Sequence, residues 1–445
     1  MTPADNPLEH FPYRWTEETG VPAHLRVRAE GLPLRQALWS GVGYLRKYRD
    51  AKWTAAPEEV RHFEAQRQLV RHLAAQPAEG PRLAAVGDLM WLRDHWDSFL
   101  SPEVLAYLNG HAAVIGNLES PIARSRRVPR LLPDYFTYNS DPRLITSFRR
   151  ESGASTFSAL GTANNHCLDR GDAGLAETLA FLDELGIPHS GVRASADERA
   201  WTTFEAGGFR IGFYAACWGL NSPDLVRTSR HQIEVVPGLV PVGPDVVDLT
   251  RLKSVLDEMR QEMIDFRIVA LHWGHEFEFY PCPRVMRVAR EVVRAGADLL
   301  VGTHPHVVQP LEVLLVNGYA DRLRQEAPGL DALEAEGGSL LEDETGVPRK
   351  ALVAYSLGNF ATAMYTLHCR IGLILGLTLT RDRATGRTDW QHPEKQLVFN
   401  VRRDGAGQRR LMLLDRYLRE CERQGNSHHE VRQLAARIAR HLVGK

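Results

Sequence analysis

Six short apolar segments of this chain each stop just before residues that commonly bind metal ions, and no other feature constrains the fold as strongly. Short continuous apolar runs bounded by polar residues are typical of buried β-strands. In open α/β sheets, ligand-binding residues gather beyond the carboxyl ends of the strands. We therefore expect one polynuclear metal site, assembled from distant segments of an α/β domain. The six runs are Leu83–Val86, Ala112–Ile115, Phe157–Leu160, Ile268–Leu271, Leu299–Val301 and Leu352–Tyr355.

The residues that follow these runs carry carboxylate, imidazole and amide groups. A divalent cation in a hydrolytic site takes about four to six such donors, and these types suit Zn, Mn or Fe. Any one of them alone is more readily explained as a turn, a cap or a hydrogen-bonded core residue. His304-Pro305-His306 is harder to dismiss, because extended backbone around the proline is expected to direct both histidines to one face. The candidate ligands are Asp88, Glu119, Asn165, His272, His304 and His306.

Composition narrows the class of protein. The chain has 445 residues, of which 44% are hydrophobic and 24% charged, as expected for a globular protein with a sizeable core. A formal net charge of −1 does not indicate bulk attraction to nucleic acid or to an anionic membrane. No apolar run reaches the roughly 18 residues of a membrane span, and the first residues lack a signal-peptide pattern, so we expect a cytoplasmic protein. Five widely spaced cysteines without a Cys-x-x-Cys pair suit a reducing compartment. The oligomeric state stays open.

Three regions differ in their patterning. Residues 1–80 are expected to form a helical N-terminal extension. Residues 81–380 alternate strand-like and helix-like segments, which is the signature of a layered α/β domain. Within them, the acidic, glycine-containing stretch 319–350 is interpreted as a surface insertion. Residues 381–445 are expected to form a C-terminal extension, with a polar segment rich in turns followed by a helix over 428–442.

The segments around the candidate ligands are individually weak motifs, but their combination and order are specific. They are Gly87–Met90, Asn117–Glu119, Ala163–His166 with Asp169–Gly171, His272–Gly274 with Glu276, Gly302–Val307 with Gln309, and Ser356–Phe360. Over roughly Leu83 to Thr362, this combination resembles the bacterial poly-γ-glutamate capsule-biosynthesis family of the CapA type. That family belongs with the calcineurin-like metallophosphoesterases. The resemblance implies a four-layer α/β/β/α sandwich that holds two divalent metal ions (Mn, Fe or Zn) at the strand ends.

The resemblance also divides the ligands between the two metals, with Glu119 as the bridge. Ordinary metallophosphoesterases carry a histidine ligand two positions after the first carboxylate. Here that position is Met90, as it is in the capsule family, which leaves the first metal with fewer protein ligands. The implied sets are Asp88, Glu119 and His306 for the first metal, and Glu119, Asn165, His272 and His304 for the second.

His166 matches the family histidine that donates a proton or a hydrogen bond near the leaving group, which makes it the general-acid candidate. Asp169, three residues later, is expected either to orient the His166 imidazole or to cap the following helix. Cys167 adjoins this motif, but no Cys/His/Asn pattern supports a nucleophile. We interpret it as a packed small residue.

Further residues are candidates for contact with a substrate. Glu276 is expected either to contact substrate or to brace His272. A basic stretch follows Glu119, and such a stretch is usually a solvated loop, although beside a metal site it could steer a polyanionic or phosphorylated substrate. Arg124 and Arg127 are the substrate-binding candidates. The whole stretch contains Arg124, Arg126, Arg127 and Arg130.

The reaction class follows from the site, and the substrate does not. Phosphoester and amide hydrolysis both fit a dinuclear centre with a nearby acid. The resemblance favours a metal-dependent enzyme that hydrolyses or transfers a γ-glutamyl or related amide. A metallophosphoesterase acting on a phosphorylated small molecule is one alternative, and a non-catalytic scaffold that binds a γ-glutamyl polymer or a partner synthetase is another. Family members commonly carry an N-terminal membrane anchor that this chain does not show, so a direct export role is not expected, and action on a small peptide or metabolite is at least as plausible.

Overall fold

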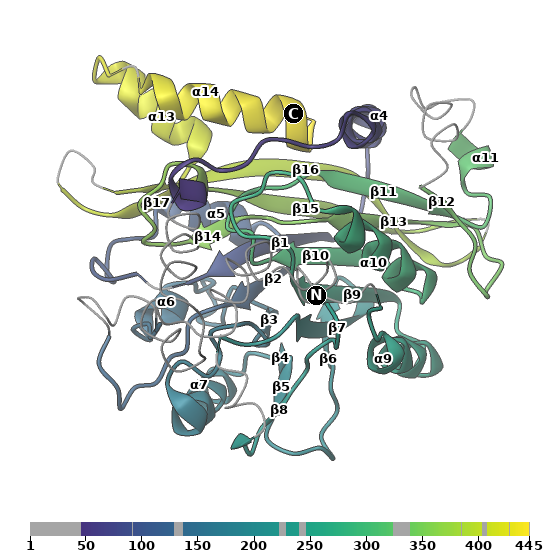
Figure 1. Ribbon diagram of the computed structural model, residues 1–445, viewed down its shortest axis with the longest axis horizontal. Helices are drawn as coiled ribbons and strands as arrows, with labels where there is room; N and C mark the ends of the chain where they lie inside the picture. The colour runs from purple at the N-terminus through teal and green to yellow at the C-terminus, as the bar shows by residue number, and fades with distance from the viewer. Residues whose placement is uncertain are drawn as a thin grey trace, which may run out of the picture.

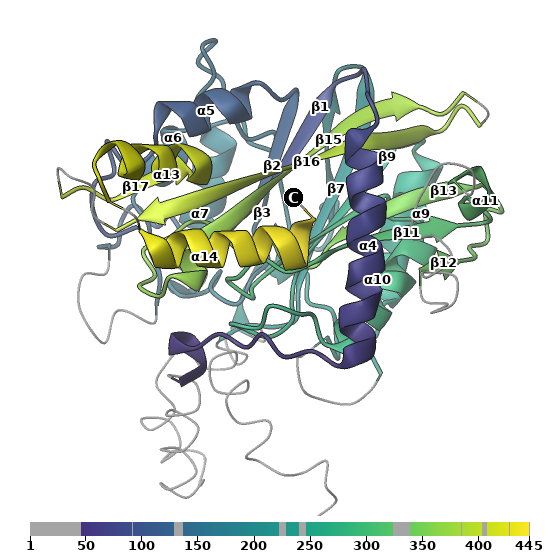
Figure 2. The same ribbon diagram turned by 90° about the horizontal axis from the view of Figure 1, so that it is seen from above.

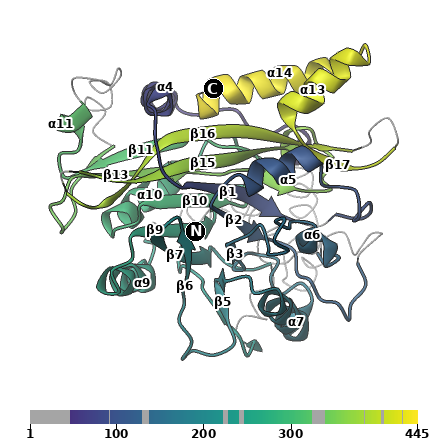
Figure 3. The ribbon, with the colours of Figure 1, turned by 180° about the vertical axis from the view of Figure 1, so that it is seen from behind.

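The computed structural model describes residues 46–90, 92–128, 137–221, 228–239, 246–323, 339–383, 385–402, 407–426 and 428–444. Two β-sheets pack face to face, with helices on their outer faces (Figure 1). Seen from behind, the layers keep their order from top to bottom while left and right are exchanged, so that α11 lies on the left (Figure 3). The predicted α/β/β/α sandwich is confirmed.

The first sheet has eight strands in the order β17–β16–β15–β1–β2–β3–β4, with β14 beside β1. Strands β1 to β4 are parallel, whereas β15, β16 and β17 join them in antiparallel fashion. The parallel part therefore brings several carboxyl ends to one edge. The strands are β1 (Arg82–Leu89), β2 (Ala113–Leu118), β3 (Ala159–Gly161), β4 (His189–Ser190), β14 (Asn359–Ala361), β15 (Ile371–Arg381), β16 (Thr388–Val401) and β17 (Arg410–Leu413).

The second sheet has seven strands in the order β12–β11–β13–β10–β9–β7–β6. Strands β7, β9, β10 and β13 are parallel, so this sheet also collects carboxyl ends at one edge. A separate pair is formed by β5 (Val192–Arg193) and β8 (Gln232–Ile233). All six predicted strands are confirmed. The strands of the second sheet are β6 (Thr202–Ala206), β7 (Phe209–Cys217), β9 (Phe266–His272), β10 (Leu299–Thr303), β11 (Leu311–Val316), β12 (Leu340–Leu341) and β13 (Arg349–Ala354).

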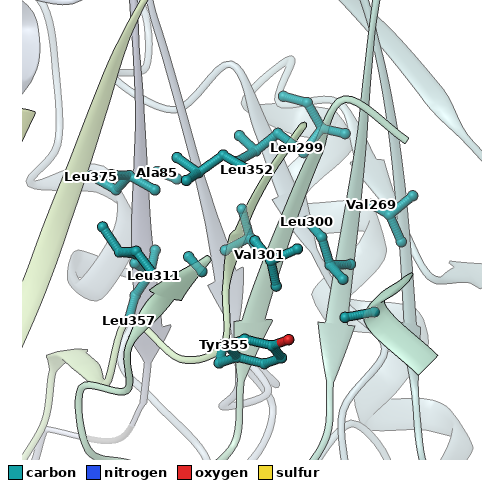
Figure 4. Packing of buried hydrophobic residues seen from close by; sticks show 14 of the residues in the cluster. Ala85, Val269, Leu299, Leu300, Val301, Leu311, Leu352, Tyr355, Leu357 and Leu375 are labelled. Carbon is teal, nitrogen blue, oxygen red and sulfur yellow. The ribbon is translucent and has the colours of Figure 1, made fainter. Parts of the chain in front are cut away.

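Alternation along β1 shows how the layers form. Successive strand residues point to opposite faces. Leu83 and Ala85 pack in the core between the sheets, whereas Ala84 and Val86 pack beneath the outer helices. Figure 4 shows Ala85 in the same packed layer as residues of the second sheet, among them Leu352. Because both faces of β1 are apolar, this strand reads in the sequence as a continuous hydrophobic run.

Helices cover both sheets. In Figure 1, α6 and α7 lie on one side of the molecule and α9 and α10 on the other. None of the described helices combines the length and apolar composition that a bilayer crossing requires. The helices are α4 (Pro57–Ala75), α5 (Pro102–Asn109), α6 (Arg143–Thr146), α7 (Gly171–Glu184), α9 (Thr250–Gln261), α10 (Pro283–Arg294), α11 (Ala320–Leu323), α13 (Leu414–Arg423) and α14 (His429–Ile438), with short helical turns η3 (His368–Arg370) and η4 (Ala439–Val443).

Helix α4, which lies in the N-terminal extension, packs across β11 and β16 (Figure 2). The side-chain amide of Gln66 accepts a hydrogen bond from the Val313 backbone N–H (2.7 Å) and donates one to the Val313 carbonyl (3.1 Å). Strand β12 pairs with β11 only at Leu315 and Val316, so Gln66 satisfies backbone groups that this short strand does not reach. Residues 1–45 of the predicted extension lie outside the described residues.

Two segments set apart by the sequence join the sheets. After residue 380, β16 and β17 extend the first sheet, and α14 forms the expected terminal helix. Within 319–350, β12 and the start of β13 belong to the second sheet. The part of that stretch from 324 to 338 lies outside the described residues.

Candidate metal centre

The six predicted ligands converge where the carboxyl ends of both sheets meet. They come from the ends of β1, β2, β3, β9 and β10 or from the residues directly after them. Every one of them is buried, with at most 4% of its surface exposed. Register supports this convergence, because Asp88 pairs with Asn117 across β1 and β2, and His272 pairs with Thr303 across β9 and β10.

Two groups of side chains are close enough to bind a metal ion, and Glu119 belongs to both. In each group the potential ligand atoms all lie within 4.8 Å of one another. Asn165 joins the second group, since its Oδ1 lies 2.8 Å from His272 Nε2. These groups contain residues of the two ligand sets that the resemblance implies, and the binding of metal by them stays a prediction. The groups are Asp88, Glu119 and His306, and Glu119, His272 and His304.

Glu119 is the side chain least satisfied by the protein. It is fully buried, and neither of its carboxylate oxygens has a hydrogen-bond partner in the described part of the chain. The nearest ring nitrogens are His272 Nε2 at 3.6 Å and His306 Nδ1 at 3.9 Å. Burial, reinforced by the charge of Asp88, raises the pKa of Glu119 well above its ordinary value. A buried, unsatisfied carboxylate costs several kcal/mol, and a bound cation offsets that cost. The donor set thus fits a metal ion.

Asp88 is held in place by the protein. Asn117 Nδ2 donates a hydrogen bond to Asp88 Oδ1 (2.7 Å), and the His304 backbone N–H donates to Oδ2 (3.1 Å). Burial raises the pKa of Asp88, although nearby His306 opposes that shift. Asn117 also lies 3.3 Å from His272 Nδ1, so one amide links a carboxylate of the first sheet to an imidazole of the second.

The backbone of His304-Pro305-His306 differs from the expectation. Both histidines have positive φ angles, 93° for His304 and 58° for His306, so the predicted extended backbone is wrong. Non-glycine residues rarely adopt this region, and such strain concentrates at functional sites. The turn is held by the Phe277 backbone N–H, which donates to the Pro305 carbonyl (2.9 Å). The two side chains converge because the chain twists here, and not because it alternates as a strand does.

The three histidines differ in protonation. Burial lowers the pKa of His272 well below its ordinary value and that of His304 to about 3, so both rings are neutral and offer a lone pair. Burial acts in the same direction on His306, but Glu119, Glu276 and Asp88 outweigh it and raise the pKa of His306 to about 10. His306 Nδ1 lies 3.0 Å from Asn359 Oδ1. A metal bound to this ring must displace its proton.

His166 lies beside the second group and is oriented by three neighbours. Its Nδ1 is 2.7 Å from Asp169 Oδ2, and Tyr138 stacks on its ring with centroids 3.8 Å apart. Asn221 Nδ2 lies 3.3 Å from His166 Nδ1, while Asn221 Oδ1 accepts a hydrogen bond from Asn165 (3.1 Å). Asp169 also accepts from the Tyr138 backbone N–H (2.6 Å), and the helix after it is not capped by a side chain. Of the two predicted roles for Asp169, the orientation of His166 matches these contacts.

Two other predicted residues are close to the site. Glu276 is buried, and its carboxylate lies 3.5 Å from His306 Nε2, so it supports His306 and not the expected His272. Burial acts to raise the pKa of Glu276, but the hydrogen bond from His306 and the neighbouring imidazoles lower it. Cys167 is buried, and burial raises the pKa of its thiol well above the ordinary value, in keeping with a packed residue.

The basic stretch after Glu119 does not show the contacts with the ligand groups that Glu276 does. Arg124 donates two hydrogen bonds to Glu184 (2.6 and 2.7 Å), the last residue of α7. His166 and Asp169 precede the first turn of that 14-residue helix, which spans about 21 Å. This pairing favours the solvated-loop interpretation for Arg124. The Arg127 side chain is exposed, and its role stays a prediction. Arg130 lies outside the described residues.

Sequence reasoning missed the amide groups that hold the ligands. Asn117 precedes Glu119 by two residues, and this spacing on a strand predicts a shared face. Asn221 lies beyond the end of β7, after the apolar Trp218-Gly219-Leu220, so no polar residue directly at the strand end marks it in the sequence. Asn359 stood in a recognised motif but was not assigned a role.

Several known proteins are similar in sequence or structure to this chain. A family model described as bacterial capsule synthesis protein PGA_cap matches residues 82–364, more than half of the chain. Capsule biosynthesis protein CapA of Bacillus anthracis is 27% identical over 244 residues, which cover 52% of this chain and 56% of that protein. PGA biosynthesis protein CapA of Bacillus subtilis (strain 168) is 27% identical over 206 residues, which cover 45% and 49%.

This chain spans about half the length of the curated relatives it matches. Among solved structures, a 5'-nucleotidase precursor from Thermus thermophilus is 16% identical, with 72% of this chain and 54% of that chain covered and a TM-score of 0.34. On the extent of the family match, this chain belongs to the bacterial capsule synthesis protein family PGA_cap.

Proposed function

We propose that this protein is a metal-dependent hydrolase that acts on a γ-glutamyl or related amide bond at a centre of two divalent cations, Mn, Fe or Zn. Glu119 carries the proposal. A fully buried carboxylate that has no hydrogen-bond partner in the described chain, and that two ligand groups share, is hard to explain without cations.

The ligands differ in number between the two metals. Asp88, Glu119 and His306 would hold the first, and the second would gain Asn165 beside Glu119, His272 and His304. Met90, which is 2% exposed, offers the first metal no hard donor, so we expect weaker binding there. Cations so held supply Lewis acidity to the scissile carbonyl and lower the pKa of a bound water.

His166 is proposed to protonate the leaving group. Its Nδ1 faces Asp169 at 2.7 Å, which fixes the ring and holds a proton on that nitrogen. Nε2 is then the atom that passes a proton to the departing amine. The stacked Tyr138 ring restricts rotation of the imidazole, so the donor stays aimed in one direction.

The relatives' names concern capsule and PGA biosynthesis, and they favour a γ-glutamyl substrate over a phosphorylated one. Phosphoester hydrolysis is the alternative reaction. A scaffold that binds a γ-glutamyl polymer or a partner synthetase is the non-catalytic alternative.

The test is a comparison of substrate panels. Wild type with added Mn or Zn is assayed on γ-glutamyl amides and on phosphomonoesters and phosphodiesters. We expect turnover of the amides, abolished in Glu119→Gln and kept in Glu205→Gln, a control at an exposed strand glutamate. Turnover of phosphoesters alone would replace the amide proposal, whereas binding of γ-glutamyl oligomers without any turnover would favour the scaffold.

A further inference from the structure

Three arginines lie at the edge of the first sheet that also carries candidate metal ligands. Strand β16 runs parallel to β1, because both are antiparallel to β15. The carboxyl ends of β1 and β16 therefore lie at the same edge as the amino ends of β15 and β17. Arg370 directly precedes β15, Arg402 directly follows β16, and Arg409 directly precedes β17. We name these three residues the arginine edge.

Two arginines of this edge have no counter-charge in the described part of the chain. Arg409 pairs with Asp94 (2.8 Å), whose side chain is half exposed. No carboxylate of the described residues lies within ion-pair distance of Arg370 or Arg402. The pKa of Arg370 is lowered to about 10, by burial first and then by the charges of Arg402 and Arg409, against the influence of Tyr417. Arg370 therefore stays charged at neutral pH, among like charges.

The strand register holds these like charges together. Val401 pairs with Arg410 across β16 and β17. This register, continued by one residue, sets Arg402 opposite Arg409. Like charges directly opposite one another on neighbouring strands destabilise a sheet. A bound anion would remove this repulsion.

Aromatic rings and a backbone carbonyl fix two of the guanidinium groups. Arg370 Nε donates to the Asn400 carbonyl (2.7 Å), and Arg370 Cζ lies 4.6 Å from the ring centroid of Phe399. Arg402 Cζ lies 4.3 Å from the ring centroid of Tyr365, which is 38% exposed. A stacked guanidinium keeps its remaining N–H donors in one plane, so it loses little conformational entropy when it binds a carboxylate.

The arginine edge is connected to the metal centre through Asn359. Asn359 Oδ1 lies 3.0 Å from His306 Nδ1, and Asn359 Nδ2 donates to the Cys369 carbonyl (2.9 Å), one residue before Arg370. At this end of the sheet, β14 pairs with β1 and packs against β15. Three strand spacings of about 4.8 Å put β16 on the order of 14 Å from β1. A polymer held at the centre can extend over that distance.

We propose that the arginine edge binds carboxylates of a γ-glutamyl polymer while one of its amides lies at the metal centre. This inference rests on the proposed function and deepens it, because it makes the substrate a polymer and not a small peptide. A γ-linked glutamyl chain keeps a free α-carboxylate on every unit, so it presents anions well away from the scissile amide. A carboxylate also matches the planar donor fork of arginine.

The test compares oligomer lengths on the full chain loaded with Mn. The probes are a fluorescent γ-glutamyl dimer, the hexamer, and a hexamer whose α-carboxylates are amidated. Anisotropy gives the affinities, and mass spectrometry confirms that the probes stay intact. Wild type should bind the hexamer at least about tenfold more tightly than either other probe. In Arg370→Gln/Arg402→Gln this difference should shrink to within about twofold.

Further variants keep the test independent of any loss of folding. Arg402→Gln, at an exposed residue, should weaken hexamer binding by a few-fold. Asp94→Asn should strengthen it, because Arg409 is released from its ion pair. Arg383→Gln, at an exposed arginine in the turn at the opposite end of β15 and β16, is the matched control and should behave as wild type. Metal content should equal that of wild type in every variant.

Each contrary outcome has a separate meaning. A hexamer preference that persists in Arg370→Gln/Arg402→Gln, or that is absent from wild type, overturns the arginine edge as a binding surface. Inorganic polyphosphate of matched charge that displaces the hexamer from wild type more strongly than unlabelled hexamer does would overturn the γ-glutamyl ligand. If the arginine edge binds the hexamer but neither substrate panel is turned over, the hydrolase proposal fails and the binding surface stands.

Discussion

The second sheet carries buried charged clusters at both ends of its parallel strands, and only one of them is complete. At the amino ends, Asp298 accepts hydrogen bonds from Arg267 (3.1 Å) and Arg387 (2.8 Å), with Arg349 3.8 Å away. At the carboxyl ends, Glu119 faces imidazoles without a hydrogen bond from the described residues. A buried cluster whose polar groups are all hydrogen-bonded is explained by its contribution to the fold. A buried carboxylate without a hydrogen bond indicates a ligand-binding site.

The pKa values of the central carboxylates, Asp298 and Glu119, differ between the two clusters in the same sense. Burial acts to raise the pKa of Asp298, but Arg267, Arg387 and Arg349 outweigh it and lower that pKa to about 2. Burial and the charge of Asp88 raise the pKa of Glu119, and the opposing charge of His306 does not outweigh them. A cavity of about 430 Å³ is lined by the same three arginines at the amino ends. Its lysine and arginine side chains are already paired with carboxylates, so cavity volume is a poorer guide to the site than an unsatisfied carboxylate.

We expect the largest effect from substitution of Glu119, the proposed bridging ligand. Glu119→Gln should lose most of the bound metal, because it is the one residue in both ligand groups, whereas Asp88→Asn should spare the second metal. Elemental analysis after gentle purification gives the metal content, with one to two equivalents expected in wild type. With chelator present, Glu119→Gln should melt no lower than wild type, since it removes a buried unsatisfied charge. Equal metal loads in the two proteins would place Glu119 outside the site.

The next effect concerns His166. His166→Ala should keep its metals, because Asn165 is the proposed ligand, and should lose roughly 10²–10⁴-fold in turnover of an amide with a poor leaving group. The deficit should shrink with an activated aryl leaving group, which departs without a proton. Steady-state kinetics with both kinds of substrate measures the difference. Loss of metal from His166→Ala would contradict the separation of ligand from acid.

Substitution in the Asp298 cluster is expected to change the free energy of unfolding and not the metal content or turnover. Asp298→Asn leaves three guanidinium groups without their shared carboxylate, and we expect a loss of about 3–5 kcal/mol in the free energy of unfolding. In wild type, a pKa lowered from 3.8 to about 2 contributes stability that is present above pH 3.8 and is lost as the pH falls toward 2. Urea unfolding at several pH values tests both points. Unfolding that is equally acid-sensitive in wild type and Asp298→Asn would disprove the second.

The smallest effect is the pH dependence of metal loading. His306 has a pKa raised to about 10, so its proton must leave when a metal binds. Apparent affinity should therefore rise with pH between about 7 and 10, by about tenfold per pH unit for each proton displaced. Calorimetry in buffers of different ionisation enthalpy counts those protons. Affinity that does not change with pH would remove His306 from the ligands.

Much of this architecture could be predicted because buried parallel strands leave a plain signal. Runs such as Leu299–Val301 are apolar on both faces, and their order places their carboxyl ends together. Strand β16 was missed because its first half alternates buried and half-exposed positions and includes Pro393, so it reads as a turn-rich segment. The convergence of the ligands could be predicted as well, although their function remains a proposal.

The backbone conformation and the supporting hydrogen bonds of the site could not be predicted from the sequence. Nothing local in His304-Pro305-His306 indicates positive φ angles, and the turn is held from another strand end by the hydrogen bond that the Phe277 backbone N–H donates to the Pro305 carbonyl. The supporting amides of Asn117 and Asn221 act across the two sheets, and such pairing depends on register that a single sequence does not reveal. The contacts of residues 48–52 with the loop 276–279 were likewise hidden, because they join segments far apart in the chain.

Glu119 comes from the first sheet and His304 from the second. Any cation they share would therefore form a reversible cross-link between the two sheets. Like a disulfide, it would close a long loop and restrict the unfolded chain, but it would open with chelator and not with reductant. Metal supply would then set the lifetime of the folded protein as well as its chemistry. Removal of the metal would then lower the free energy of unfolding as well as the activity.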